Sequence, residues 1–341
     1  MTRIPSELPP DLGKVAFTVD QGRRMGLTRR RMRANDLDRP FPGVRQAAAP
    51  AQPGAESLDQ DGSADARRTA EARFRDRCVA VGLIVPPGAF FTHRTAARLW
   101  PLPLPALPTL PADEPIHIGV MLPEHPPRRS DVVGHAISDP LAFTVRRDDH
   151  LLIDPATLFC QLGAVLKVED LVAVGDALVL APRRATDSGD RPWLDLPTLR
   201  DRVERFRGRG KARADRALQL VRPGAESRPE SLVRLAILAA GLPEPELNVD
   251  VYSSSGIFVG RADLLYRRYR LAIEYDGDHH RVDSVQFDRD IGRLDDFAAA
   301  GWRVVRIAKR SFFGDREACI GRVRRALIDA GWRPGPIPHP C

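Results

Sequence analysis

Two apolar runs on either side of a short basic turn constrain the fold of this 341-residue chain more than any other feature. The runs are Phe258–Tyr266 and Leu271–Asp276, and the turn is Arg267-Arg268-Tyr269-Arg270. Strand-forming runs that flank a short turn are typical of a β-hairpin. A hairpin centred in the middle of this turn places Asp263 directly opposite Glu274 on the neighbouring strand.

Carboxylates opposed in this way indicate a metal site. Their Cβ atoms would lie ~5 Å apart, and like charges at that distance disfavour the fold unless a cation or a proton offsets them. Asp276, two residues after Glu274, leaves the same face of the strand and adds a third oxygen donor. We therefore expect Asp263, Glu274 and Asp276 to bind Mg²⁺ or Mn²⁺, because Mg²⁺ prefers a few carboxylates together with water and substrate phosphate.

Residues before and after the hairpin complete the candidate catalytic set. Glu230 follows Ser227 at the spacing of a capping box, so by itself it is better explained as a helix cap than as a catalyst. His279 and His280 follow Gly277, which lets the backbone turn sharply after the strand. Either imidazole can carry a proton or orient water, although each one alone is more often a surface residue.

The remaining part of this segment predicts a helix and a further strand, at 302–307. The helix has apolar residues at helical spacing, which predicts a stripe that faces the core; they are Phe287, Ile291, Leu294 and Ala298. Gln286, Asp290 and Arg293 share a neighbouring face and point towards the site, or Asp290 and Arg293 form an ion pair within the helix. Residues 225–332 are therefore predicted to form a mixed sheet flanked by helices.

The first 45 residues have the outline of a helix-turn-helix. A short helix follows Thr18, Gly26-Leu27-Thr28 interrupts it, and a second basic helix at 29–35 is expected with Thr28 as its N-cap. Its arginines suit contacts with nucleic-acid phosphates; they are Arg29, Arg30, Arg31 and Arg33. A solvated basic helix without a DNA partner explains the same pattern.

Composition divides the rest of the chain. Residues 46–69 lack large apolar side chains and are predicted to be a linker. Residues 70–181 predict a small α+β domain, with helices at 71–81, 155–166 and 169–180 and strands at 116–122 and 132–137. Residues 182–224 predict a basic helical connector in which Arg207 and Arg209 contribute to a positive surface, and 333–341 a tail. The fold class is α/β, an α+β multidomain chain.

The charge of the chain favours an anionic partner. The formal net charge is +7 and the sequence pI is about 9.7, which makes nucleic acid the leading candidate. The excess of arginine, 48 residues against 4 lysines, is explained equally well by the coding composition of the genome. No apolar run predicts a membrane span, and residues 1–10 show no signal peptide, so we expect a cytoplasmic protein. The four cysteines form no CxxC pair and indicate neither a disulfide framework nor a zinc site.

The motif Glu274-Tyr275-Asp276-Gly277-Asp278-His279-His280, with Asp263 before it and Gly301-Trp302-Arg303-Val304-Val305-Arg306 after it, carries a family resemblance. It resembles the very short patch repair endonuclease-like branch of the PD-(D/E)XK nuclease superfamily, over about residues 225–330. The resemblance implies hydrolysis of DNA phosphodiesters by a Mg²⁺-activated water, with Asp263 and Glu274 as metal ligands, Glu230 as the upstream helix acid and His279 or His280 assisting. Asp276 takes the position at which that superfamily has lysine.

The N-terminal region and the segment 93–100 are similar to AbiEi-like antitoxins of abortive-infection systems, which implies a DNA-binding module. Two functions follow. The first is a Mg²⁺-dependent DNA endonuclease that serves phage defence or repair, with Arg29, Arg30, Arg33, Arg207, Arg209 and Arg293 as nucleic-acid contacts. The second is a transcriptional repressor or antitoxin with an inactive nuclease fold and a toxin or other protein as partner. RNA stays an alternative to DNA, because phosphate contacts do not separate the two polymers.

Overall fold

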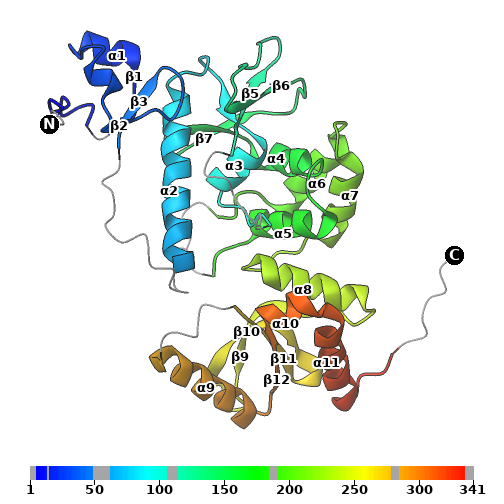
Figure 1. Ribbon diagram of the computed structural model, residues 1–341. Coiled ribbons are helices and arrows are strands. Elements are labelled where there is room, and N and C mark those ends of the chain that lie inside the picture. Colours follow the sequence, from blue (N-terminus) through cyan, green and yellow to red (C-terminus); the bar gives the residue numbers. More distant parts are fainter. Residues whose placement is uncertain are drawn as a thin grey trace. The chain divides into compact units, whose positions relative to one another are not determined.

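The chain folds into helices and mixed β-sheets, which confirms the predicted α/β class (Figure 1). The computed structural model describes residues 5–13, 15–48, 62–105, 114–183, 191–277 and 284–334, without the side chains of 62–67 and 284–291. Contacts divide the chain into a first unit, Met1–Ala97 with Ala106–Asp154, and a second unit, Arg98–Pro105 with Pro155–Cys341. This boundary falls within the stretch 70–181 that was predicted as one domain.

The first unit begins with a three-stranded sheet of order β1-β3-β2. Its elements are β1 (Phe17–Thr18), α1 (Val19–Arg24), the 3-10 turn η1 (Arg31–Arg33), β2 (Leu37–Asp38) and β3 (Val44–Ala47). Thr18 caps α1, because its hydroxyl accepts from the backbone N–H of Gln21 while the Gln21 side chain accepts from that of Thr18. The first predicted helix is therefore present.

The second helix expected at 29–35 is wrong: only the single turn η1 forms there. The reason lies in Arg31, which is buried instead of facing a phosphate. Its guanidinium donates to both carboxylate oxygens of Asp36 at 2.8 Å and to the carbonyl of Ser6 at 2.6 Å. The turn is thereby tied to the body of the unit, and an α-helix that continued past it would break these bonds.

A five-stranded sheet of order β6-β5-β4-β8-β7 forms the rest of the first unit. Its elements are α2 (Gly62–Gly82), β4 (Phe90–Phe91), α3 (His93–Leu99), β5 (Ile116–Met121), β6 (Val132–Ile137), β7 (Thr144–Arg147) and β8 (His150–Ile153). The strands predicted at 116–122 and 132–137 are confirmed, whereas β7 and β8 were not predicted. Both β3 and α2 extend into the predicted linker, of which residues 49–61 lie outside the described part.

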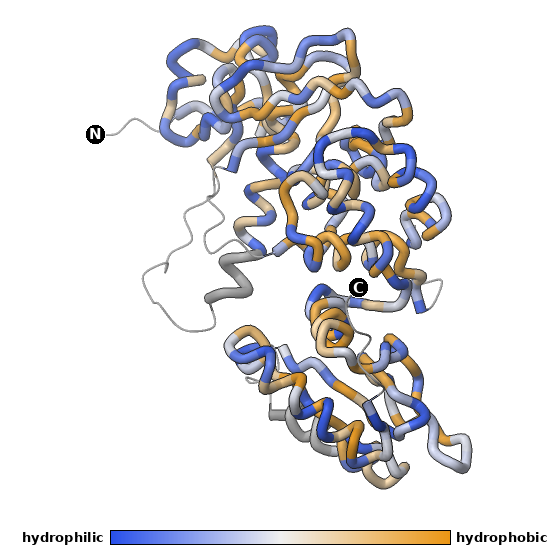
Figure 2. The backbone as a smooth tube through the Cα atoms, turned by 90° about the vertical axis from the view of Figure 1, so that its right-hand side faces the viewer, coloured by the Kyte–Doolittle hydropathy of each residue, from blue (hydrophilic) through white to orange (hydrophobic). Residues whose placement is uncertain are grey.

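The second unit begins with five helices. They are α4 (Pro155–Leu162), α5 (Val168–Val179), α6 (Leu196–Arg205), α7 (Lys211–Leu220) and α8 (Arg228–Ala239). The helices predicted at 155–166 and 169–180 are confirmed as α4 and α5, and α6 and α7 lie in the predicted helical connector. Most residues of α4 and α5 are buried, and the backbone in Figure 2, coloured by hydropathy, contains strongly apolar helical segments in orange. No helix in the described ranges is long and apolar enough to cross a membrane.

A four-stranded sheet of order β12-β11-β10-β9 completes the second unit. Its elements are β9 (Glu246–Tyr252), β10 (Phe258–Tyr266), the 3-10 turn η2 (Arg267–Tyr269), β11 (Leu271–Asp276), α9 (Ser284–Ala299), β12 (Arg303–Ala308), α10 (Lys309–Gly314) and α11 (Arg316–Asp329). Strands β10 and β11 pair antiparallel with Leu264 opposite Ile273, which is the predicted register. Strand β12 pairs parallel with β11, and β9 is an unpredicted strand at the other edge.

Helices cover both faces of this sheet (Figure 1). On one face Val233 of α8 and Val323 of α11 pack with Ile273 of β11. On the other face Phe297 of α9 packs with Leu265 and other residues of the sheet. The sheet is therefore buried on two sides, and its core separates into two apolar clusters.

The apolar stripe predicted for α9 is wrong at its C-terminal end. Ala298 is exposed and Leu294 is half-buried, whereas Phe297 is buried; the side chains of Phe287 and Ile291 lie outside the described part. Gly260 of β10 explains why Phe297 is the buried residue of this part of α9, because a Cβ atom at position 260 would lie 2.8 Å from the Phe297 ring. The glycine makes room for an aromatic ring, and the ring sets the rotation of α9.

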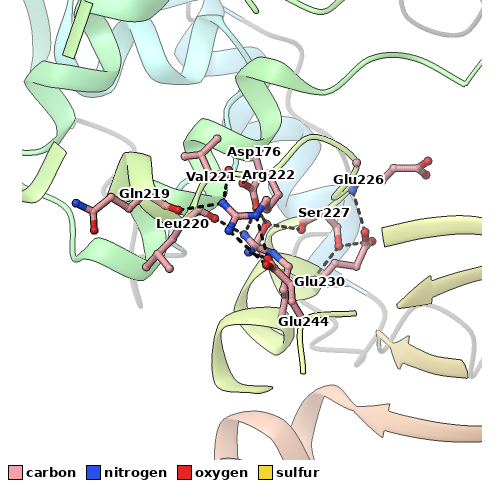
Figure 3. A network of polar contacts seen from close by, with 12 residues as sticks. Asp176, Gln219, Leu220, Val221, Arg222, Glu226, Ser227, Glu230 and Glu244 are labelled. Carbon is pink, nitrogen blue, oxygen red and sulfur yellow. Dashed lines mark hydrogen bonds and ion pairs between the residues drawn. The ribbon is translucent and has the colours of Figure 1, made fainter. Parts of the chain in front are cut away.

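A buried ion pair joins α5 to α8 within the second unit. The Arg234 side chain is 0 % exposed, and its Nη2 lies 3.1 Å from Oδ2 of Asp176. The guanidinium also donates to the carbonyl of Leu220 at 2.7 Å and to Glu244 at 3.0 Å. Asp176 accepts in addition from the backbone N–H of Arg222 at 2.7 Å (Figure 3). Each charge of the pair is thus held by several partners.

We predict that Arg234→Met lowers the free energy of unfolding by about 3–5 kcal/mol, because it leaves the carboxylate of Asp176 buried without its cation. Urea denaturation measures the change. Arg216→Met, which removes an exposed arginine of α7, is the matched control and should stay within about 0.5 kcal/mol of the wild type. Equal stability of the two variants would contradict the role given to the ion pair.

Candidate metal-binding carboxylate site

Asp263 and Glu274 come together at the centre of the second unit's sheet. Strands β10 and β11 pair in the predicted register as far as Leu264 and Ile273, and Asp263 and Glu274 are the next residue on each strand. The charge of Asp263 acts on Glu274, so the two carboxylates are close together. Oδ2 of Asp263 accepts from the backbone N–H of Tyr275 at 2.7 Å, which holds its side chain against β11. Glu274 is only 6 % exposed. A buried and a half-buried carboxylate, those of Glu274 and Asp263, are therefore neighbours in the strands that form the core.

Burial and mutual repulsion make the charged forms of these groups unfavourable. Burial, and then the charge of Asp263, raise the pKa of Glu274 to about 7, although Arg293 donates to its Oε2. Burial also raises the pKa of Asp263, against the hydrogen bond from Tyr275 and the charge of Arg293. Oε1 of Glu274 is buried and has no hydrogen-bond partner among the described residues. An orphaned carboxylate oxygen of this kind fits a hard cation, which would satisfy it.

Glu230 both stabilises the start of α8 and belongs electrostatically to the site. It accepts from Ser227 Oγ at 2.6 Å, from the backbone N–H of Glu226 at 2.8 Å and from Asn248 Nδ2 at 2.6 Å (Figure 3). Ser227 caps the helix, which confirms the predicted helix start, whereas Glu230 accepts from the backbone N–H of Glu226 and not from that of Ser227 as in a capping box. Burial raises the pKa of Glu230, and the charge of Asp263 raises it further. The charge of Asp263, on the strand, therefore acts on Glu230, on the helix.

Asp276 does not join Asp263 and Glu274 in one cluster, contrary to the prediction that it supplies a third oxygen donor. Its Oδ2 lies 2.7 Å from Nη2 of Arg306, on the parallel strand β12. The described part of the chain places no three carboxylates with their oxygens within 4.8 Å of one another. Asp276 pairs with Ala308 in the sheet, so Lys309, the next residue, begins α10 at the same end of the sheet. The sequence alone gives no reason to place Lys309 there.

Of the other predicted site residues, the structure describes the side chain of Arg293 but not those of four further residues. His279 and His280 lie outside the described residues, as do the side chains of Gln286 and Asp290. Arg293 was expected either to point at the site or to pair with Asp290. It reaches the site and pairs with Glu274.

The basic residues predicted to contact nucleic acid are mostly accessible. Arg29, Arg30 and Arg33 are exposed in the first unit, and Arg207 and Arg209 are exposed in the second. The guanidinium of Arg207 donates to the carbonyls of Glu204 and Phe206, at 2.5 Å and 3.0 Å, and so folds back on its own helix. Contact with phosphate stays a prediction for all five.

The structure also reveals a cluster that the sequence analysis missed. His93, His117 and His135 of the first unit place one ring nitrogen each within 4.8 Å of the others. Their separations along the chain match no short metal-binding motif, so only the pairing of strands brings them together. The available signal was weak: three of the eight histidines lie in or beside three successive predicted elements.

A scan against protein-family models found no model that matches this chain, and a search of curated proteins found no match either. The chemistry of the two clusters is therefore the basis for any statement about function.

The raised pKa of Glu274 predicts a pH-dependent stability. In the folded chain Glu274 keeps its proton up to about pH 7, whereas an unpaired glutamate loses it near 4.5. Its contribution to the free energy of unfolding is therefore present below pH 4.5 and is lost as the pH rises to about 7. Glu274→Gln, which cannot ionise, should become progressively more stable than the wild type across this window, as measured by urea denaturation at a series of pH values.

The matched control for this experiment is Glu317→Gln, which removes an exposed carboxylate on α11. It should leave the pH profile of the wild type unchanged. Parallel profiles for the wild type and Glu274→Gln would show that Glu274 does not titrate in this window.

Proposed function

We propose that the chain is a divalent-metal-dependent endonuclease that hydrolyses DNA phosphodiesters, of the PD-(D/E)XK type that its sequence resembles. The observation that carries the proposal is the pair of Asp263, half-buried, and Glu274, buried, next to the last paired residues of β10 and β11, with one orphaned oxygen on Glu274. Two neighbouring carboxylates that are withdrawn from water disfavour the fold, and binding a cation offsets that effect. Carboxylates whose pKa is raised by burial and by a neighbouring charge are concentrated at functional sites.

In this proposal Asp263 and Glu274 hold Mg²⁺ or Mn²⁺ through their oxygens, and the bound ion supplies an activated water and neutralises charge on the phosphate. The charge of Asp263 raises the pKa of Glu230, which favours a proton on Glu230. Arg293 brings a guanidinium to the edge of the site, where it can donate to a phosphate oxygen of the substrate.

DNA is the proposed substrate because of the basic charge of the chain and the exposed arginines in both units. RNA offers the same phosphates, so the substrate class rests on the resemblance to the repair endonuclease family. A role in phage defence or in DNA repair is consistent with either.

A second candidate function is supported by two contacts in the structure. Arg293 occupies one oxygen of Glu274, and Arg306 pairs with Asp276, the residue at the position of the superfamily lysine. Acidic groups that are neutralised by arginine can serve as a scaffold without catalysis. The alternative is therefore an AbiEi-like repressor or antitoxin whose nuclease fold binds DNA or a toxin.

We predict that the wild type nicks supercoiled plasmid in the presence of Mg²⁺ or Mn²⁺. Asp263→Asn and Glu274→Gln should each lower the initial rate by more than about 100-fold, because loss of a ligand exceeds the 10- to 100-fold effect of a residue that only supports one. Asp329→Asn, which removes an exposed carboxylate paired with Arg303, is the matched control and should cut at the wild-type rate.

The same assay separates the two functions. Cutting that persists in both site variants would contradict the assignment of the carboxylate site. Binding of the chain to its own promoter region in a gel-shift experiment, with no cutting under Mg²⁺ or Mn²⁺, would support the repressor. Competition between matched DNA and RNA duplexes measures which polymer is preferred.

A further inference from the structure

The three histidines of the first unit are brought together by strand pairing. Strands β5 and β6 pair parallel with Gly119 opposite His135, so His117, two residues before Gly119, leaves the same face of the sheet as His135. His93 arrives from β4, which pairs antiparallel with β5, and the backbone N–H of Thr92 donates to the carbonyl of His117 at 3.2 Å. Three separate segments thus converge on one point.

The imidazole rings are close enough to share one ion. Nδ1 of His117 lies 2.9 Å from Nε2 of His135, and the rings of His93 and His135 stack with centroids 3.9 Å apart. One nitrogen of each ring lies within 4.8 Å of the others. Two nitrogens bound to one tetrahedral zinc ion lie about 3.3 Å apart, so small ring rotations bring the three nitrogens to binding distance.

The backbone at His93 supports a specific role for this position. His93 has a φ of 52°, in the left-handed region that a residue with a side chain rarely adopts. Such a conformation costs energy and is concentrated at functional sites. Oγ1 of Thr92, a fully buried residue, lies 3.1 Å from Nδ1 of His93 and orients the ring. A hydrogen bond to one ring nitrogen is the usual support for a histidine that binds metal through the other.

We infer that His93, His117 and His135 form a binding site for a divalent transition metal of the zinc class, with a fourth position open to an exchangeable ligand. Three imidazoles suit zinc, copper, nickel or iron, whereas Mg²⁺ prefers oxygen ligands. A site with three protein ligands keeps one position for water or substrate, and the three side chains are only half-buried. This site is separate from the carboxylate pair and requires nothing of the proposed nuclease.

The electrostatic surroundings favour the neutral imidazoles that bind metals. Burial, and then the neighbouring histidines, lower the pKa of His93 to about 3, and burial followed by His117 lowers that of His135 to about 4. Burial also lowers the pKa of His117, on which the charges of Glu114 and Arg94, an ion pair at 2.9 Å, act in opposite directions. A divalent ion would therefore meet uncharged ligands.

The test is a calorimetric titration of the full chain with Zn²⁺ in a millimolar excess of Mg²⁺, which occupies the carboxylate site first. One zinc ion per chain is expected. His135→Gln and His93→Asn should each weaken binding at least about 10-fold. Asparagine is used at position 93 because it tolerates a positive φ better than most residues. Co²⁺ should give the visible absorption of a four-coordinate ion, and the same two variants should lose it.

Two further variants make the result decisive. His150→Gln removes a half-buried histidine of β8, in the same sheet but outside the cluster, and should bind zinc as the wild type does. Glu274→Gln disables the carboxylate site and should also leave zinc binding unchanged, so failure of the nuclease proposal does not affect this one. Absence of zinc binding by the wild type, or equal binding by His135→Gln when circular dichroism shows it folded, would overturn the inference.

Discussion

The pairing of β10 with β11 is the constraint on which the candidate site and the second unit's core both depend. Side chains alternate between the two faces of a strand, so a shift of one residue would exchange those faces. In the observed register Leu264 and Ile273 meet α8 and α11, while Asp263 and Glu274 lie opposite each other on the face of α9. The apolar pattern that fixes the register thus also forces two acids together, and their electrostatic penalty is the consequence of a well-packed core.

The hairpin could be predicted from the sequence because the information is local. Its turn, its alternation and the opposition of its carboxylates are all contained in nineteen consecutive residues, 258–276. The helices α4 to α8 were also predictable, because apolar periodicity and caps such as Ser227 lie within each segment. What failed depends on contacts between distant residues. The Arg31 side chain is buried because it donates hydrogen bonds to Asp36 and to the carbonyl of Ser6. Phe297 is buried because Gly260, on a different element, leaves space for its ring.

The candidate site shows the same division. Asp263 and Glu274 were predictable as a pair, but the partners that tune them were not. Arg306 and Lys309 lie near Asp276 because β12, some thirty residues later in the chain, pairs parallel with β11. No spacing within the local sequence predicts such a parallel pairing. The histidine cluster is an extreme case, since His93, His117 and His135 are joined only through two different strand pairings. Sites assembled by strand pairings between distant segments are therefore the ones that sequence patterns miss.

The two clusters also differ in the chemistry they select. One offers carboxylate oxygens in a setting where their charge is disfavoured, and the other offers imidazole nitrogens that burial keeps neutral. Hard and borderline cations prefer these ligand sets respectively, so the two proposals assign the clusters to different metals on the basis of ligand type.

The buried ion pair between Arg234 and Asp176 limits how this architecture can be reused by gene fusion. A recombination event that joined the sheet of the second unit to another protein at residue 225 would carry Arg234 without Asp176 and without the carbonyl of Leu220. The transplanted α8 would then expose to water the side of Arg234 that contacts Asp176 and Leu220, with Glu244 as its remaining partner. The sheet and the helices from α5 onwards are therefore expected to pass between genes as one piece.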